Sequence, residues 1–262
     1  MNTRTQPSFF ISHGSPMMAV ENSATSNFIA GLDKTIEKPD AIIVFSAHFD
    51  LRKDIVITSG LAPKTIHDFY GFPQELYDIK YPASGSPELA KKIANRFESY
   101  GLKPILSDEQ GWDHGVWIPL ILMYPDADIP VVQVSINSLL GAEVNYRYGE
   151  ILSDFRDNNI LIIGSGGISH NLREVFNPVP DKDRVTKVTA FTDWINNKLL
   201  QQDKNAMFHY LDEAPFTQFN HPSQDHFLPL MAAWGASNAA KGERIHQGME
   251  FEILALDAFR FD

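Results

Sequence analysis

Short apolar runs recur along the chain and predict buried strands. Each run has five to seven residues and is largely apolar at consecutive positions rather than at alternate ones. Such runs are typical of strands that are covered on both faces, as in a parallel sheet. The predicted strands are Ser8–Ser12, Ala41–Ser46, Ile129–Ser135 and Ile160–Gly164. A later run, Met249–Leu256, alternates between apolar and polar positions and predicts an antiparallel strand at an edge of the sheet.

Helical patterns separate the predicted strands. The segment from Ser86 to Gly101 begins with a capping serine, a proline and an acidic residue, which is a typical helix start. Apolar residues then recur at every fourth position until a glycine ends the helix. Further helices are predicted at Asn145–Asp157, Arg184–Gln202 and Gln224–Ala239. This alternation predicts an α/β fold in a single domain over residues 1–262, with a central, mostly parallel sheet flanked by helices.

Composition narrows the classes of function. The chain has 262 residues, of which 44% are apolar and 21% are charged, as in globular proteins. Its net charge of −11 argues against binding to nucleic acid or to an anionic membrane, because both need a basic protein face. The sequence has no cysteine, which excludes disulfides, iron–sulfur clusters and cysteine nucleophiles. Any metal must therefore be held by histidine or carboxylate side chains.

The apolar stretches predict neither a membrane span nor a secretory signal. The densest one, Val116–Tyr124, has nine residues and contains Pro119, whereas a spanning helix needs about 20 residues. Met1–Pro7 contains one arginine and no long apolar run after it. We therefore expect a soluble, cytoplasmic protein.

Histidines follow three of the four predicted strands. His13 comes directly after the first strand, His48 follows the second, and His170 comes after a glycine-rich loop at the end of the fourth. In open α/β sheets, ligands bind beyond the carboxyl ends of the strands, so these side chains are expected to meet there. Imidazole is the commonest protein ligand of transition metals. From position alone, a metal site and ordinary structural roles for these histidines stay equally open.

Other motifs in the same segments are weaker. The loop Gly164–Gly167 follows a strand as a dinucleotide-binding loop would, but Ser169 occupies the position of the third glycine. The alternative is that its glycines allow a tight turn and a close approach of the backbone to a ligand. The chain contains neither a Gly-x-Ser-x-Gly elbow nor a His-Glu-x-x-His motif. A serine hydrolase or a thermolysin-like protease is therefore not expected.

Eight motifs in collinear order resemble the class III extradiol ring-cleaving dioxygenases, most closely their 4,5-DOPA extradiol dioxygenase branch. They span residues 10–230, which is most of the chain. The motifs are Phe10–Pro16, Val44–His48, Thr65–Pro73, Leu76–Tyr77 with Tyr81–Gly85, Trp112–Trp117, Met123–Pro130, His170–Arg173 and Asp225–Leu230. The resemblance implies an α/β domain with a metal site at the carboxyl ends of the strands, and an enzyme that opens aromatic rings.

The resemblance also implies roles for five histidines. His13 and His48 match metal ligands of the family, in agreement with their places at strand ends. The third ligand matches His226, where relatives such as protocatechuate dioxygenase have a glutamate. His170 matches the acid–base histidine beside the metal, with a pKa near neutrality, and is also a candidate metal ligand. His114 matches a histidine that contacts substrate or dioxygen.

The same resemblance implies the substrates and the metal. The substrates are O2 and a small catechol similar to DOPA, and Fe(II) is the active metal. Three neutral ligands also suit zinc, so we expect protein purified from an overexpressing host to carry Zn(II). The candidate substrate contacts are His67, Phe69, Tyr70, Phe72, Trp117 and Arg173. For His67, a structural role in which it bonds to Asp68 stays equally open.

Three rival functions stay open at this point. A zinc-dependent hydrolase would use the histidine site with Asp113 or Asp225 as general base. A non-enzymatic, metal-binding family member is the second rival, and a nucleotide-binding oxidoreductase, based on the glycine-rich loop, is the third. The sequence leaves the native catechol and the oligomeric state, monomer or dimer, undetermined.

Overall fold

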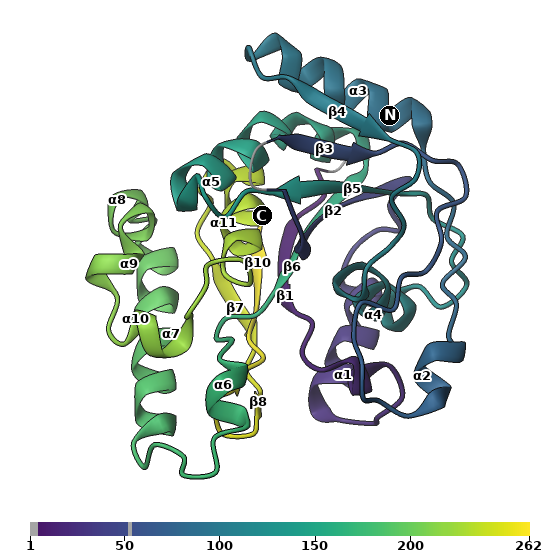
Figure 1. The fold of residues 1–262 in the computed structure, drawn as a ribbon. Helices are drawn as coiled ribbons and strands as arrows, with labels where there is room; N and C mark the ends of the chain where they lie inside the picture. The colour runs from purple at the N-terminus through teal and green to yellow at the C-terminus, as the bar shows by residue number, and fades with distance from the viewer. Residues whose placement is uncertain (1–4, 52–53) are drawn as a thin grey trace.

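An eight-stranded sheet in the order β4-β3-β5-β2-β6-β1-β10-β7 forms the centre of the protein (Figure 1). The computed structural model describes residues 5–51 and 54–262. The four central strands run parallel to one another and are β1 (Ser8–Ser12), β2 (Ala41–Asp50), β5 (Val131–Ile136) and β6 (Ile160–Gly166). They confirm the four strands predicted from the apolar runs, with bounds that differ by a few residues.

Antiparallel strands complete both edges of the sheet. At one edge, β3 (Ile55–Thr58) pairs antiparallel with β5 and parallel with β4 (Pro104–Ser107). At the other edge, β10 (Ala258–Phe261) lies between β1 and β7 (Glu243–His246), antiparallel to both. These strands have four residues each, which is too short for a clear pattern of apolar positions.

The predicted edge strand Met249–Leu256 is wrong. This segment instead forms a separate two-stranded hairpin of β8 (Met249–Glu250) and β9 (Leu254–Ala255). The backbones of Phe251 and Glu252 have φ angles of 51° and 59°, so the chain reverses there rather than extending. The hairpin lies below the carboxyl end of the sheet, near the candidate site (Figure 1).

Helices cover both faces of the sheet. Helices α3 (Pro87–Ser99), α5 (Gly141–Ile151), α7 (Arg184–Gln201) and α11 (Leu228–Ala236) contribute to the core on one face. Helices α1 (Ala24–Ala30) and α4 (His114–Met123) contribute to the core on the other. The shorter elements are η1 (Pro16–Ala19), η2 (Leu32–Thr35), α2 (Gln74–Asp78), η3 (Ser153–Asn158), α6 (Leu172–Val175), α8 (Lys204–Phe208), α9 (Tyr210–Glu213) and α10 (Thr217–Asn220).

Helix bounds differ from prediction in two places. The predicted helix Asn145–Asp157 starts earlier and divides into α5 and η3. The predicted helix Gln224–Ala239 begins only at Leu228, so His226 lies in the irregular segment before the helix rather than on it. The other two predicted helices are confirmed by α3 and α7.

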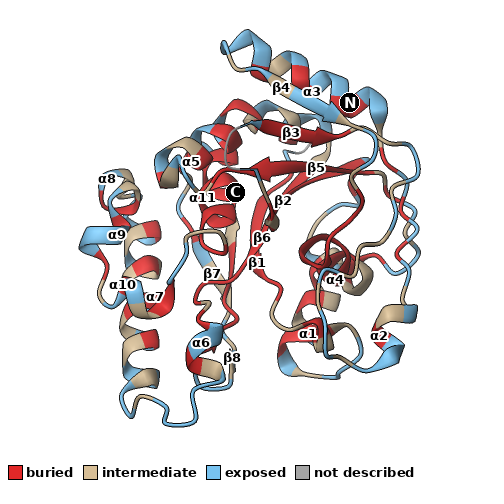
Figure 2. Ribbon diagram, viewed as in Figure 1, coloured by how far each residue is buried: buried red, intermediate tan, exposed pale blue. Residues whose placement is uncertain are grey.

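The four central strands of the sheet, β1, β2, β5 and β6, are largely buried (Figure 2). On β1, Phe10 packs into the core beside α11, whereas Phe9 and Ile11 pack into the core beside α4. Consecutive apolar residues of the strand therefore pack alternately into the two cores, which explains the apolar runs in the sequence. In the described part of the chain, no helix combines the length and the apolar character that crossing a membrane requires.

Candidate metal centre and active site

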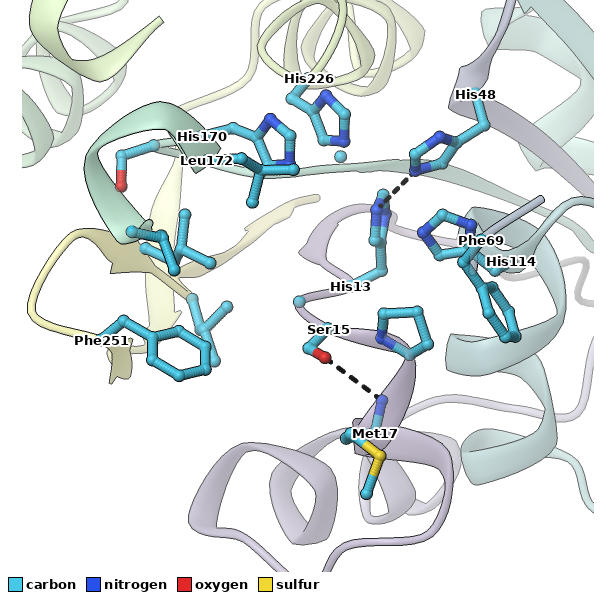
Figure 3. A pocket seen from close by; sticks show the side chains of 18 of the residues that line it. His13, Ser15, Met17, His48, Phe69, His114, His170, Leu172, His226 and Phe251 are labelled. Carbon is cyan, nitrogen blue, oxygen red and sulfur yellow. Dashed lines mark hydrogen bonds between the residues drawn. The ribbon is translucent and has the colours of Figure 1, made fainter. Parts of the chain in front are cut away.

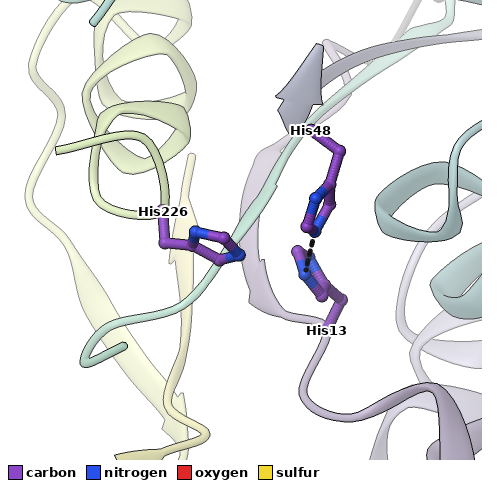
Figure 4. Close-up of side chains that lie close together, drawn as sticks. All are labelled: His13, His48 and His226. Carbon is purple, nitrogen blue, oxygen red and sulfur yellow. Dashed lines mark hydrogen bonds between the residues drawn. The ribbon is translucent and has the colours of Figure 1, made fainter. Parts of the chain in front are cut away.

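Three histidines from distant parts of the chain converge at the carboxyl ends of the central strands (Figure 4). His13 follows β1, His48 lies near the end of β2, and His226 precedes α11. One ring nitrogen from each lies within 4.8 Å of the others, and the Nε2 atoms of His13 and His48 are 3.0 Å apart. The structure therefore brings together the three residues that the sequence suggested as metal ligands.

His48 departs slightly from its predicted place. It was expected beyond the second strand, but β2 extends to Asp50 and includes it. The regular pairing of β2 with its two neighbours nevertheless ends at Ser46, after which the register shifts. His48 is consequently released from the regular ladder and lies at the open end of the sheet.

Hydrogen bonds fix the protonation of two of these rings. The Ser165 hydroxyl donates to the carbonyl of Gly115, so it can only accept from His13 Nδ1, which lies 3.0 Å away. His226 Nδ1 lies 2.6 Å from the Asp225 carboxylate and donates to it. In both rings Nδ1 therefore carries the proton, and Nε2 presents a lone pair to the centre.

The unpaired nitrogen of His226 shows that the cluster suits a metal. His226 Nε2 is buried and has no hydrogen-bond partner among the described residues. A buried polar atom without a partner is rare in a folded protein, and a metal ion would satisfy this one together with its two neighbours. Three imidazole nitrogens are a donor set that suits zinc and ferrous iron.

Burial keeps these histidines neutral. It lowers the pKa of His13 and of His226 well below the usual value, and the neighbouring imidazoles lower both further. Burial and the nearby His114 lower the pKa of His48 to about 3. A metal ligand must be deprotonated, so the ligand nitrogens are ready for a cation at neutral pH.

His170 stacks on His226 rather than joining the three-nitrogen group. The two rings are nearly parallel, at 4°, with centroids 3.4 Å apart. Among the described residues, two groups of side chains have ligand atoms within 4.8 Å of one another, His13 with His48 and His226, and His48 with Asp68 and His114, and His170 belongs to neither. From the sequence, a near-neutral pKa is expected for His170, but burial in the structure lowers this pKa to about 4. At neutral pH the ring is therefore a proton acceptor.

Asp68 connects two histidines of the site and was not singled out from the sequence. Its Oδ1 atom accepts from the backbone N–H of His114 at 3.0 Å and from Nδ1 of the same residue at 2.8 Å. Its Oδ2 atom lies 3.7 Å from His48 Nδ1. Burial alone would raise the pKa of Asp68, but these interactions outweigh it and lower the pKa to about 2. Asp68 thus provides a negative charge to a site whose candidate ligands are all neutral.

Asp113 lies beside the site but outside its cavity. The carboxylate accepts from Ser46 Oγ at 2.6 Å and from the side-chain amide of Gln133. Burial raises the pKa of Asp113 to about 6, although the bond from Ser46 opposes the rise. Asp113 is absent from the cavity lining, so the arrangement does not support its predicted alternative role as a hydrolytic base.

The glycine-rich loop has a packing role that the sequence did not reveal. Gly164 and Gly166 belong to β6, and a Cβ at either would collide with a backbone carbonyl, of Pro229 or of His226 respectively. The N–H of Gly167 donates to the same His226 carbonyl at 2.9 Å. The glycines therefore allow β6 to approach the segment that carries His226, whereas the prediction had the backbone approach a ligand. The alternative of a dinucleotide-binding loop finds no support.

A cavity of about 570 Å³ opens beside the histidines (Figure 3). His13, His48, His114, His170 and His226 form its polar end. Its other walls are mostly apolar and include Met17, Phe69, Tyr70, Phe72, Leu172, Phe176, Phe251 and Leu256. A cavity of this size and character accommodates a small aromatic molecule.

Three predicted substrate contacts lie outside the lining of this cavity. Trp117 is fully buried and donates to the carbonyl of Ile66 at 3.0 Å. His67 bonds the carbonyl of Ile79 at 3.0 Å, so the alternative in which it bonds Asp68 is wrong. Arg173 is exposed on α6 and does not line the cavity. Aromatic residues alone do not distinguish a pocket wall from the core behind it.

Acidification is expected to destabilise the metal-free protein. Burial lowers the pKa of His13, His48, His170, His221 and His226, so the unfolded chain binds more protons than the folded one below about pH 6.5. Each such histidine removes up to about 1.4 kcal/mol of stability per unit of falling pH. Urea unfolding of the metal-free protein between about pH 7.5 and 5.5 measures this loss.

Two buried carboxyl groups change the unfolding free energy in the opposite direction, because they stabilise the protein on acidification. Burial raises the pKa of Asp113 to about 6 and that of Asp257 to about 7, so their contribution to stability is lost as pH rises through these values. Two such groups do not outweigh five histidines. An unfolding free energy that stays constant or increases on acidification would contradict the expectation.

The fold and the site define an α/β protein with a candidate histidine-ligated metal centre that faces an aromatic-lined cavity. Residues 7–258 match the family model described as the catalytic LigB subunit of aromatic ring-opening dioxygenase. The chain belongs to this family, the LigB class III extradiol dioxygenases, and is an oxidoreductase that opens aromatic rings. The family predicted from the eight motifs is thereby confirmed.

Relatives cover nearly the whole chain. It is 39% identical over 259 residues to the 4,5-DOPA dioxygenase extradiol of Beta vulgaris, covering 97% of this chain and 95% of the relative. It is also 39% identical over 262 residues to the protein of the same name from Escherichia coli K12, covering 98% and 94%. A crystal structure of an uncharacterized protein from E. coli K12 superposes with a TM-score of 0.81 at 31% identity, covering 98% of this chain and all of that one.

Proposed function

We propose that the protein cleaves a catechol ring beside its two hydroxyl groups, with a ferrous ion held by His13, His48 and His226. The observation that carries this proposal is the buried, unpaired Nε2 of His226 next to two further imidazole nitrogens and an aromatic-lined cavity. The family implies a catechol-like substrate and O2. L-DOPA is the first catechol to assay because the relatives in B. vulgaris and E. coli are named for it.

The metal, when bound, supplies a Lewis-acid centre that favours the deprotonated catechol and brings it next to O2. The reaction balances with one catechol and one O2: a ring C–C bond breaks, and both oxygen atoms enter the product, a semialdehyde that also carries a carboxylate. No external reductant is needed because the catechol supplies the electrons. The contribution of the chain is to hold the two substrates together and to move protons.

His170 is the proposed acceptor of a catechol proton. Its ring lines the cavity, is neutral at physiological pH, and stacks on the proposed ligand His226. A neutral imidazole in this position takes the proton from a substrate hydroxyl without a separate activation step. The stacking fixes the plane of the ring and therefore the direction of its acceptor nitrogen.

His114 is the proposed partner of the oxygen atoms. Asp68 accepts from Nδ1 of His114, so Nε2 is the free nitrogen of this ring. When Nε2 holds a proton, His114 donates to oxygen that becomes negative during the reaction, and the Asp68 carboxylate stabilises the positive ring. The rings of Phe69 and His114 pack edge to face, with centroids 5.7 Å apart.

Oxygen uptake by reconstituted protein tests the proposal. Metal-free protein is loaded with Fe(II) anaerobically and mixed with air and a catechol panel that includes L-DOPA. We expect uptake of one O2 per catechol together with a yellow ring-opened product, and no uptake by the metal-free or zinc-loaded protein. Stoichiometric iron binding without uptake on any catechol would overturn the proposal.

We infer that zinc competes for the same three nitrogens. Zinc prefers nitrogen ligands and binds more tightly than Fe(II) to a given site. Elemental analysis of protein purified without added metal is expected to find about one zinc per chain. A preparation that contains only iron would contradict this inference without affecting the proposed reaction.

A further inference from the structure

The outer part of the cavity is an apolar rim built from three separate segments. Tyr70 comes from the loop between β3 and α2, Phe176 ends α6, and Phe251 lies at the tip of the β8–β9 hairpin. Their exposed fractions are 92%, 79% and 61%. Large apolar side chains gathered in the open at the mouth of a cavity indicate a surface that a ligand covers.

Phe251 is held at the rim by its backbone. Both Phe251 and Glu252 have left-handed backbone conformations, which are unfavourable for residues other than glycine. Arg184 Nε donates to the Glu252 carboxylate at 3.0 Å and thereby ties the hairpin tip to the start of α7. Figure 3 shows the Phe251 ring facing the cavity from the side opposite Phe69. Local structure therefore places the backbone of Phe251 at the rim.

The cavity contains no positive side chain that could pair with a charged substituent. Among the described residues that line it, there is neither a lysine nor an arginine, and Arg173 lies outside. The one carboxylate in the lining is Asp68, whose oxygens already face His114 and His48. A carboxylate on a substrate would find no side chain of opposite charge there, whereas an apolar substituent would cover the exposed rings of the rim. The net charge of −11 further disfavours an anionic substituent.

We propose that this enzyme prefers catechols with a neutral, apolar substituent over catechols whose substituent carries a charge. This inference rests on the proposed function and specifies its substrate class. The catechol ring lies at the histidine end of the cavity, and the substituent extends outward between Phe251 and Phe176 on one side and Phe69 and Tyr70 on the other. These rim residues determine specificity and take no part in the chemistry.

A matched pair of substrates tests the preference for a neutral substituent. The Fe(II)-loaded enzyme is assayed with 3,4-dihydroxyphenylpropionate and its methyl ester, and with 4-butylcatechol, L-DOPA, dopamine and catechol. We expect the ester and butylcatechol to exceed the acid and L-DOPA in kcat/KM by at least about 10-fold, which corresponds to roughly 1.4 kcal/mol. An equal or higher kcat/KM for the acid, L-DOPA or dopamine would overturn the inference.

Variants at the rim test whether Phe251 and Phe176 cause the preference for an apolar substituent. Phe251→Ala and Phe176→Ala are expected to raise KM for butylcatechol several-fold more than KM for unsubstituted catechol. Tyr100→Ala is the matched control, because Tyr100 is also exposed but lies at the end of α3, outside the cavity lining. Equal effects on catechol and butylcatechol would show that the rim does not contact the substituent.

A binding measurement separates this inference from the proposed reaction. Calorimetry with metal-free protein compares 4-hydroxyphenylpropionate with its methyl ester, neither of which needs iron or oxygen. Tighter binding of the ester, lost in Phe251→Ala, supports the inference. If no catechol is turned over, the proposed function fails, whereas turnover with a preference for charged substituents contradicts the substrate class alone.

Discussion

Replacing His13 with alanine is expected to abolish oxygen uptake and to lower the affinity for Fe(II) or Zn(II) by more than about 100-fold. Loss of a residue that only supports a ligand costs about 10–100-fold in metal affinity, and loss of a ligand costs more. His13 is one of three converging candidate ligands, and its ring centroid lies 5.0 Å from that of His48 and 5.5 Å from that of His226. Competitive titration with a chromophoric chelator measures the affinity, and an oxygen electrode measures the activity.

His209→Ala provides the matched control for His13→Ala. His209 is exposed beside α8 and bonds a backbone carbonyl within the same turn, at 2.8 Å. We expect its substitution to leave both metal affinity and activity unchanged. The fold should survive in His13→Ala as well, because His13 follows β1 and lies outside the pairing of β1 with β6. Wild-type metal affinity in a folded His13→Ala protein would show that the metal lies elsewhere.

The central sheet was predictable because its physical cause is local. Each parallel strand must be apolar on both faces, so the runs at β1, β2, β5 and β6 stand out without knowledge of their neighbours. Strand β4 is only partly covered, and its central residues are exposed, so no such run marks it. The hairpin at Phe251 was mistaken for a continuous strand because alternation does not reveal where a backbone reverses.

The convergence of the candidate ligands was predictable from the sequence, whereas the residues that support them were much less so. His13 and His48 were recognised by their places at strand ends, and His226 by its motif. The support of Asp68 depends on the path of a loop that brings it to His114, 46 positions away in the sequence. Trp117 was placed in the pocket because it is aromatic, and aromatic character does not separate the core behind Phe69 from the wall that Phe69 forms.

Replacing Gly166 with alanine is expected to displace His226 and so to lower metal affinity by about 100-fold or more, comparable to the loss of a ligand. An added Cβ at Gly166 would lie much less than 3.0 Å from the carbonyl oxygen of His226. This oxygen belongs to the backbone, so it cannot rotate away as the end of a side chain could. The segment before α11 must then move away from β6, and the hydrogen bond from Gly167 to that carbonyl weakens. Overpacking of this kind typically costs about 1–3 kcal/mol in stability as well. Metal titration and thermal unfolding measure the two effects.

Gly167→Ala is the matched control, because a Cβ at Gly167 meets its nearest neighbour, the carbonyl oxygen of Ser169, at 3.4 Å, which is an ordinary contact. We expect this variant to bind metal and to unfold nearly as the wild type does. The comparison also decides what role the glycines of the Gly164–Gly167 loop have. If they serve a bound phosphate, both alanines weaken nucleotide binding and neither affects the metal. If they let the sheet approach the segment that carries His226, only Gly166→Ala affects the metal. Wild-type metal affinity in a folded Gly166→Ala protein would contradict the second account, because it would mean that His226 tolerates displacement of its own backbone.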